Sequence, residues 1–215
     1  MKTTALTAAA LLLATATAKP LSGSQPEKRD ADPSAVAILE TIVPTSKSCS
    51  GGEFSDECAT AAQAAPPLLA SFHKYGLVTQ SEQAALISYM AYETAGFKYV
   101  RNHFPAPGRP GQGTRSMMMP NFVQEFAATL QPAISNPDPA ALLDDVIDAG
   151  ADWEAASWYY TTKCTDEVKE GVKSGSKDGW KKYITDCVET TLDEGENSRE
   201  AYWTRAAKAL NLSGD

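Results

Sequence analysis

Residues 72–97 read FHKYGLVTQSEQAALISYMAYETAGF, and the middle of this stretch carries the clearest helix pattern in the chain. Thr79 followed by Glu82 forms a capping box, in which each side chain accepts a hydrogen bond from a free backbone N–H of the other residue. Gly96 is a typical residue for a helix C-terminus. The stretch therefore predicts a helix over residues 80–95.

The end of this helix carries a carboxyl group in an unusual position. Leu86, Met90 and Glu93 are spaced at i, i+4 and i+7, so the carboxyl continues an apolar stripe. Burial disfavours the charged form of a carboxyl and raises its pKa toward the range of a general acid. Hydrolysis of a glycosidic bond needs such a protonated carboxyl beside the leaving oxygen. Glu93 is therefore the candidate catalytic residue.

The sequence on both sides of this stretch predicts a mainly α-helical protein. Residues 101–116, RNHFPAPGRPGQGTRS, are rich in Pro and Gly and predict a long surface loop. Long loops in compact domains are usually functional. Further helices are expected at residues 59–65, 66–73, 117–130, 140–149, 152–164, 180–191 and 198–210, with turn-rich stretches at residues 132–139, 170–179 and 193–197.

The first residues are typical of an exported protein. A lysine, a short Ala/Leu-rich run and the sequence Ala-Thr-Ala predict a signal peptide over residues 1–18. A dibasic pair predicts a second cleavage that removes residues 19–29 as a pro-segment. Residues 30–215 are then expected to form a single catalytic domain, secreted and extracellular.

Composition narrows the set of partners. The formal net charge is −8, which argues against nucleic acid, because affinity for phosphates comes largely from Lys and Arg. Beyond the N-terminal run, the sequence contains no apolar segment long enough to span a membrane. We expect a monomer without a cofactor or a metal.

The four cysteines form an even set, which in an exported chain predicts disulfide bonds. Three pairings are open, and closeness in sequence favours Cys49–Cys58 and Cys164–Cys187. Metal binding is the alternative, but it is disfavoured because no CxxC spacing occurs.

Several segments together resemble one enzyme group. Residues 72–97 are similar to the segment of plant-type family 19 chitinases and related endolysins that contains the motif HE[ST], and Tyr92-Glu93-Thr94 occupies the position of that motif. Three further segments resemble parts of the same group. The Gly-rich loop is matched by GRPGQGTRSMMMPNF, the core helix by AASWYY, and the closing stretch by residues 179–210. The chain thus resembles the lysozyme-like glycoside hydrolases, which include fungal secreted muramidases.

The resemblance implies a fold, an activity and a set of binding residues. The expected fold is a lysozyme-like, two-lobed helical domain with a central cleft. Glu93 would be the general acid of a muramidase that cleaves β-1,4 bonds of peptidoglycan. A chitinase and a non-catalytic glycan-binding protein or effector are the alternatives. The predicted substrate-binding residues are Tyr92, Asn102, His103, Gln112, Thr114 and Arg115.

The chain departs from this group at the second carboxylate. No Asp or Glu occurs between Thr94 and Gln124, where the chitinases place it. Asp152 and Glu154 are the alternative candidates. The identity of the second catalytic group is therefore open.

Overall fold

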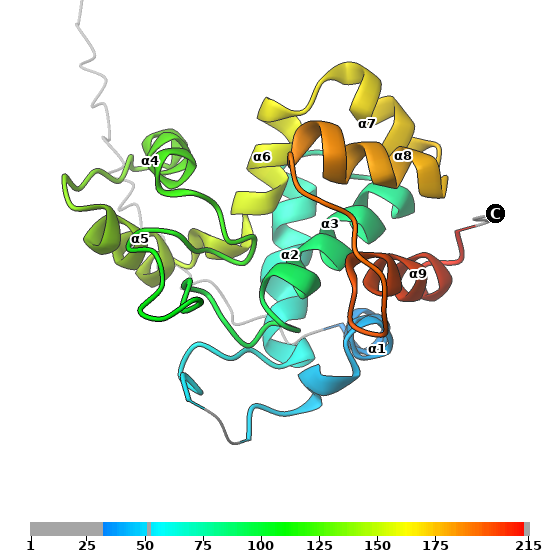
Figure 1. The fold of residues 1–215 in the computed structure, drawn as a ribbon, viewed down its shortest axis with the longest axis horizontal. Coiled ribbons are helices and arrows are strands. Elements are labelled where there is room, and N and C mark those ends of the chain that lie inside the picture. The colour runs from blue at the N-terminus through cyan, green and yellow to red at the C-terminus, as the bar shows by residue number, and fades with distance from the viewer. Residues whose placement is uncertain (1–31, 51–52, 213–215) are drawn as a thin grey trace, which may run out of the picture.

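The computed structural model describes residues 32–50 and 53–212 as a mainly helical protein, which confirms the predicted fold class (Figure 1). The predicted signal peptide and pro-segment lie outside these residues. Within the described ranges, β-structure is limited to isolated bridges from Gly113 to Arg101 and Met118. The helices are α1 (Pro33–Ile42), η1 (Pro44–Lys47), α2 (Ala61–Lys74), α3 (Gln80–Glu93), α4 (Pro120–Thr129), α5 (Pro139–Asp148), η2 (Ala151–Trp153), α6 (Ala155–Lys163), α7 (Asp166–Lys173), α8 (Lys177–Lys182), η3 (Tyr183–Cys187, a π-helical turn) and α9 (Arg199–Ala209).

The central helix α3 begins and ends close to the predicted positions. The Thr79 and Glu82 side chains form the expected capping box. Leu86 and Met90 have no exposed surface, so the apolar stripe does face the core. The helix ends at Glu93, two residues before the predicted end.

Helix α2 differs from the prediction, which started a new segment at Pro66 and Pro67. Both prolines lie inside one continuous helix. Proline removes a backbone hydrogen bond and crowds the preceding turn. The helix continues through them because its apolar face, which includes Leu68 and Phe72, is buried in the core. Tertiary packing thus outweighs the local preference.

The C-terminal half also differs in detail. Residues 170–179, predicted as a polar turn-rich stretch, contain the end of helix α7 and the start of α8. The helix predicted for residues 180–191 is shorter in the structure. Helix α8 ends at Lys182, and the π-helical turn that follows it ends at Cys187. Gly179 explains why α7 and α8 come so close, because a Cβ on it would lie 1.9 Å from the backbone oxygen of Gly171.

Buried side chains form two hydrophobic clusters. The larger one joins α1, α2, α3, α8 and α9, with the Trp180 and Trp203 rings stacked 5.5 Å apart between α8 and α9. The smaller one includes Val123 and Phe126 of α4 and Val146 of α5. In Figure 1, α4 and α5 lie to one side of the group formed by α2, α3 and α9. A cleft between two lobes remains a prediction.

Two disulfides join the cysteines in the predicted pairs, Cys49–Cys58 and Cys164–Cys187. The first pins the loop that precedes α2, and the second ties the end of α6 to the π-helical turn. Among the described residues, no helix has both the length and the apolar character needed to cross a membrane.

Candidate functional site

The Glu93 carboxyl lies at the last residue of α3 and is largely shielded, with 18% of its side chain exposed. Burial raises its pKa above the ordinary value of 4.5, while the Arg199 guanidinium opposes this shift. The C-terminal end of a helix carries partial negative charge, which also disfavours the ionised carboxyl. Glu93 is therefore a group that can hold a proton closer to neutrality than a surface glutamate.

Arg199 supplies the partner of this carboxyl. It is the first residue of α9, a helix capped by the Ser198 side chain. Its Nη2 donates a hydrogen bond to Glu93 Oε1 at 2.8 Å, and its Nη1 lies 3.8 Å from Asp193 Oδ1. The Asp193 carboxylate also accepts a hydrogen bond from the Arg199 backbone N–H at 3.0 Å. One guanidinium thus holds two carboxyl groups in a fixed relation.

Tyr92 completes this cluster. The Arg199 guanidinium lies over the Tyr92 ring, 4.0 Å from its centroid, a cation–π contact. Burial raises the pKa of the Tyr92 hydroxyl, and the nearby arginine lowers it. We call Tyr92, Glu93, Asp193 and Arg199 the acid cluster. The structure thus places two predicted site residues, Tyr92 and Glu93, side by side.

The sequence did not reveal the other two members of the acid cluster. Arg199 and Glu93 are separated by 106 positions. Asp193 lies in residues 193–197, which were predicted as a turn-rich stretch between two helices. The one local signal was the capping serine before Arg199, which places that residue in the first turn of a helix. Nothing in the sequence shows which carboxyl that turn would meet.

The other predicted binding residues bond mainly to the loop that carries them. The Asn102 side chain accepts a hydrogen bond from the Arg109 N–H at 2.9 Å, and the Gln112 side chain donates one to the Met117 carbonyl at 3.1 Å. Thr114 is fully buried and bonds to the Ser116 hydroxyl. These contacts hold the turns of residues 101–116, and a substrate-binding role for these side chains remains a prediction.

Arg115 lies inside the protein, between the loop and the core. Its Nε donates to Asp152 Oδ2 at 3.0 Å, and its Nη1 donates to the carbonyl oxygens of Glu57, Phe97 and Tyr99. The partner Asp152 is also buried. With these partners the guanidinium serves as an internal anchor, and Asp152 is its counter-ion.

His103 belongs to a second polar cluster, which it forms with Glu57. Its Nε2 lies 2.9 Å from Oε1 of Glu57, a buried carboxyl, and its ring stacks on Phe54. Glu154, the other candidate for a second carboxylate, pairs with Lys74 at 2.5 Å.

Glu93 lines neither of two hollows on the described surface. One is an apolar groove lined mainly by α1, α2 and α3. The other lies beside the first disulfide. Within residues 32–50 and 53–212, no three His, Cys, Asp or Glu side chains gather as a metal site would require. All four cysteines are in disulfides, which leaves His73 and His103 as the nitrogen ligands that a metal could use.

Fold and site together define a mainly helical, disulfide-bonded protein with a shielded carboxyl–guanidinium–carboxyl cluster. No protein-family model matches the chain. Over 162 residues it is 34% identical to a protein of Fusarium oxysporum (strain Fo5176) named "Bifunctional dioxygenase (DOX)-epoxy alcohol synthase (EAS)". The match covers 70% of this chain but 12% of that relative.

This relationship contradicts the predicted glycoside hydrolase. The relative carries the name of a dioxygenase and an epoxy alcohol synthase, so the predicted muramidase, its chitinase and glycan-binding alternatives and the glycosidase class are wrong. The physical reason is that the decisive features were generic. A capped helix that ends in a shielded carboxyl supplies a proton donor, but it does not specify which bond receives the proton. The likeness to lysozyme-like enzymes remains a resemblance, and secretion and the monomeric state remain predictions.

Proposed function

We propose that this chain is an acid–base domain that opens the oxirane ring of an epoxy alcohol, the product class in the relative's name. The chain spans 12% of that relative's length, so it corresponds to a small part of a protein named for two activities. A short chain related to one part of that protein could act on the epoxy alcohol class by a reaction of its own. Glu93 would be the proton donor.

The observation that carries the proposal is the acid cluster. Opening an oxirane needs a proton on its oxygen and a nucleophile at one of its carbons. The raised pKa of Glu93 favours the protonated form that donates. The Asp193 side chain is 35% exposed and so has access to water. Arg199 bonds to Glu93 and lies close to Asp193, and so orients the two carboxyl groups.

The bonds of the proposed step balance with water as the co-reactant. The Glu93 O–H bond breaks as its proton passes to the oxirane oxygen, and one ring C–O bond breaks. The water oxygen forms a new C–O bond at that carbon, and the Asp193 carboxylate accepts the proton that the water loses. The product is a triol. Glu93 then takes up a proton from solvent, and Asp193 releases one.

The test is turnover of phenylglycidol, a small epoxy alcohol, followed by mass spectrometry as the gain of one water. Glu93→Gln keeps the size of the side chain but removes the ionisable proton, so we expect the rate to fall roughly 10²- to 10⁴-fold. Glu170→Gln is the matched control, because Glu170 is exposed and pairs with Lys173 on the surface. If the wild type shows no turnover above buffer, or if Glu93→Gln turns over as fast as Glu170→Gln, the proposal is wrong.

A further inference from the structure

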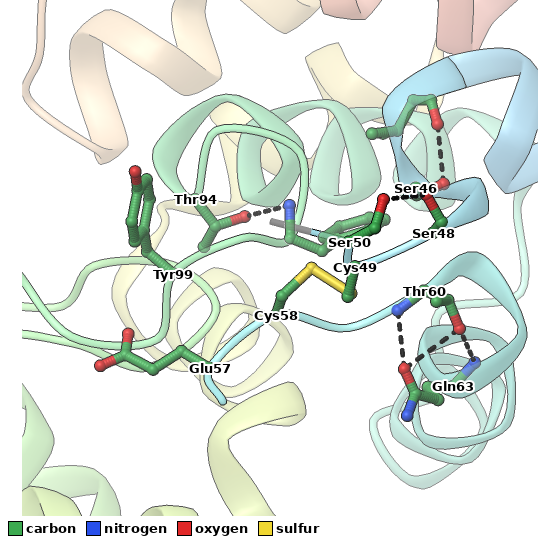
Figure 2. The surroundings of a disulfide bond; sticks show 12 residues. Ser46, Ser48, Cys49, Ser50, Glu57, Cys58, Thr60, Gln63, Thr94 and Tyr99 are labelled. Carbon is green, nitrogen blue, oxygen red and sulfur yellow. Dashed lines mark hydrogen bonds between the residues drawn. A yellow bond between two sulfur atoms is a disulfide. The ribbon is translucent and has the colours of Figure 1, made fainter. Parts of the chain in front are cut away.

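The hollow beside the first disulfide has the composition of a ligand pocket, and it lies apart from the acid cluster. Its volume is about 370 Å³, which falls within the range of about 300–1,000 Å³ typical of small-molecule sites. Its walls come from two parts of the chain. One includes Thr45, Phe54 and Cys58, and the other includes Lys98 and Phe104. Figure 2 shows Tyr99 and Glu57 close to the Cys49–Cys58 disulfide.

One wall of this pocket is held in a strained backbone. Phe54 has a φ of 64°, a left-handed conformation that bulky residues rarely adopt. Such strain persists only where neighbouring contacts enforce it, and it is concentrated at functional sites. The contact here is with His103, whose ring stacks on Phe54 at 3.6 Å between centroids and 9° between planes.

The buried carboxylate of Glu57 holds the His103 ring in place. Glu57 accepts hydrogen bonds from the backbone N–H groups of Val100 and Arg101, at 2.8 and 3.1 Å, and its other oxygen faces His103 at 2.9 Å. The Glu57 side chain is 5% exposed, so its position is set by these partners. The chain Glu57–His103–Phe54 is therefore a rigid support for an aromatic wall.

The remaining lining suggests which ligand would fit. Phe104 is 63% exposed, and Tyr99 stands edge-on to it with ring centroids 5.7 Å apart. Three aromatic rings thus border one open hollow, and aromatic rings favour stacked or edge-on contact with another ring. Of the three, Phe104 is the ring most accessible to a ligand.

The charged residues of the lining indicate which charge the ligand carries. Lys98 lines the pocket and makes no ion pair with any described residue, although the chain as a whole carries a net charge of −8. The hydroxyl groups of Ser48, Ser50 and Ser55 lie along the same lining. Glu53 also lines it and disfavours a second negative charge on the ligand. We infer that this pocket binds a planar aromatic ring that carries a single negative charge, such as an aryl carboxylate.

The experiment titrates the full chain with naphthoate and follows the ligand's fluorescence. Naphthamide, which lacks the charge, and cyclohexanecarboxylate, which lacks the aromatic ring and is followed by competition, are the matched ligands. We expect naphthoate to bind most tightly. Phe104→Ala should raise its Kd by roughly threefold to tenfold, since an aromatic pair is worth about 0.5–1.5 kcal/mol.

Lys98→Gln should weaken naphthoate severalfold and leave naphthamide unchanged, because it removes the charge contact alone. Lys208→Gln, on the exposed surface of α9, and Leu69→Ala, at the apolar groove, are the controls and should change neither. Equal binding of the three ligands, or a Kd for naphthoate unaffected by Phe104→Ala and Lys98→Gln, would overturn the inference. Because Phe104 and Lys98 are exposed, their variants should fold as the wild type does.

Discussion

Replacing Arg115 by Met tests the internal anchor between the loop and the core. In the wild type the guanidinium pairs with Asp152 and donates to three carbonyl oxygens, and both charged side chains are less than one-tenth exposed. The substitution leaves the Asp152 carboxylate buried without its counter-ion and the carbonyl groups without a donor. Removing one partner of a buried pair costs about 3–5 kcal/mol of unfolding free energy.

The measurement is equilibrium denaturation in urea with the disulfides intact, supported by the melting temperature, which should fall by roughly 10 °C. Adding Asp152→Asn to Arg115→Met should restore part of the loss, because it removes the uncompensated charge. Arg109→Met is the control on the exposed part of the same loop and should change stability by less than about 0.5 kcal/mol. A loss below about 1 kcal/mol for Arg115→Met would refute the reasoning.

Three further predictions follow from single features of the structure. The pKa of Glu93 in the folded protein lies above 4.5, so protonation of this carboxyl stabilises the folded state fully below pH 4.5. This stabilisation is lost as the pH rises through the folded pKa. Between these two pH values, the unfolding free energy of Glu93→Gln should therefore fall less than that of the wild type. Replacing Cys164 and Cys187 by Ala opens a 23-residue loop and should cost about 3 kcal/mol in urea denaturation; an unchanged midpoint would contradict this. Gly179→Ala should lower the melting temperature by several degrees, because its Cβ would clash with the Gly171 carbonyl. Gly171→Ala should be tolerated, because a Cβ there would lie 3.4 Å from its nearest neighbour. Similar melting temperatures for the two variants would disprove the close packing of α7 and α8.

Local patterns predicted most of the fold. The capping box at Thr79 and the apolar stripe through Leu86 and Met90 placed α3 within two residues of its end, because both depend on neighbours three or four positions apart. The prediction failed where packing opposed local preference. Pro66 did not end α2, and the polar residues before Gly179 did not prevent the helices α7 and α8.

The activity could not be predicted in the same way. Short motifs around Glu93 predicted a proton donor at this position, but they led to the wrong reaction class. The relative that corrected the prediction shares 34% identity over 162 residues, and this information is spread along the chain instead of lying in one motif.

The sequence by itself determined the helical class and the position of Glu93 at the end of an apolar stripe, because these depend on residues near one another in the chain. It favoured the two observed cysteine pairs but left the other pairings open. The tertiary structure alone decided that Arg199 meets Glu93 across 106 positions and that Glu57 supports the His103 ring. An ion pair between distant segments depends on how the helices dock, and many alternative carboxyl partners satisfy the same local pattern. Packing of the whole core selects one of them.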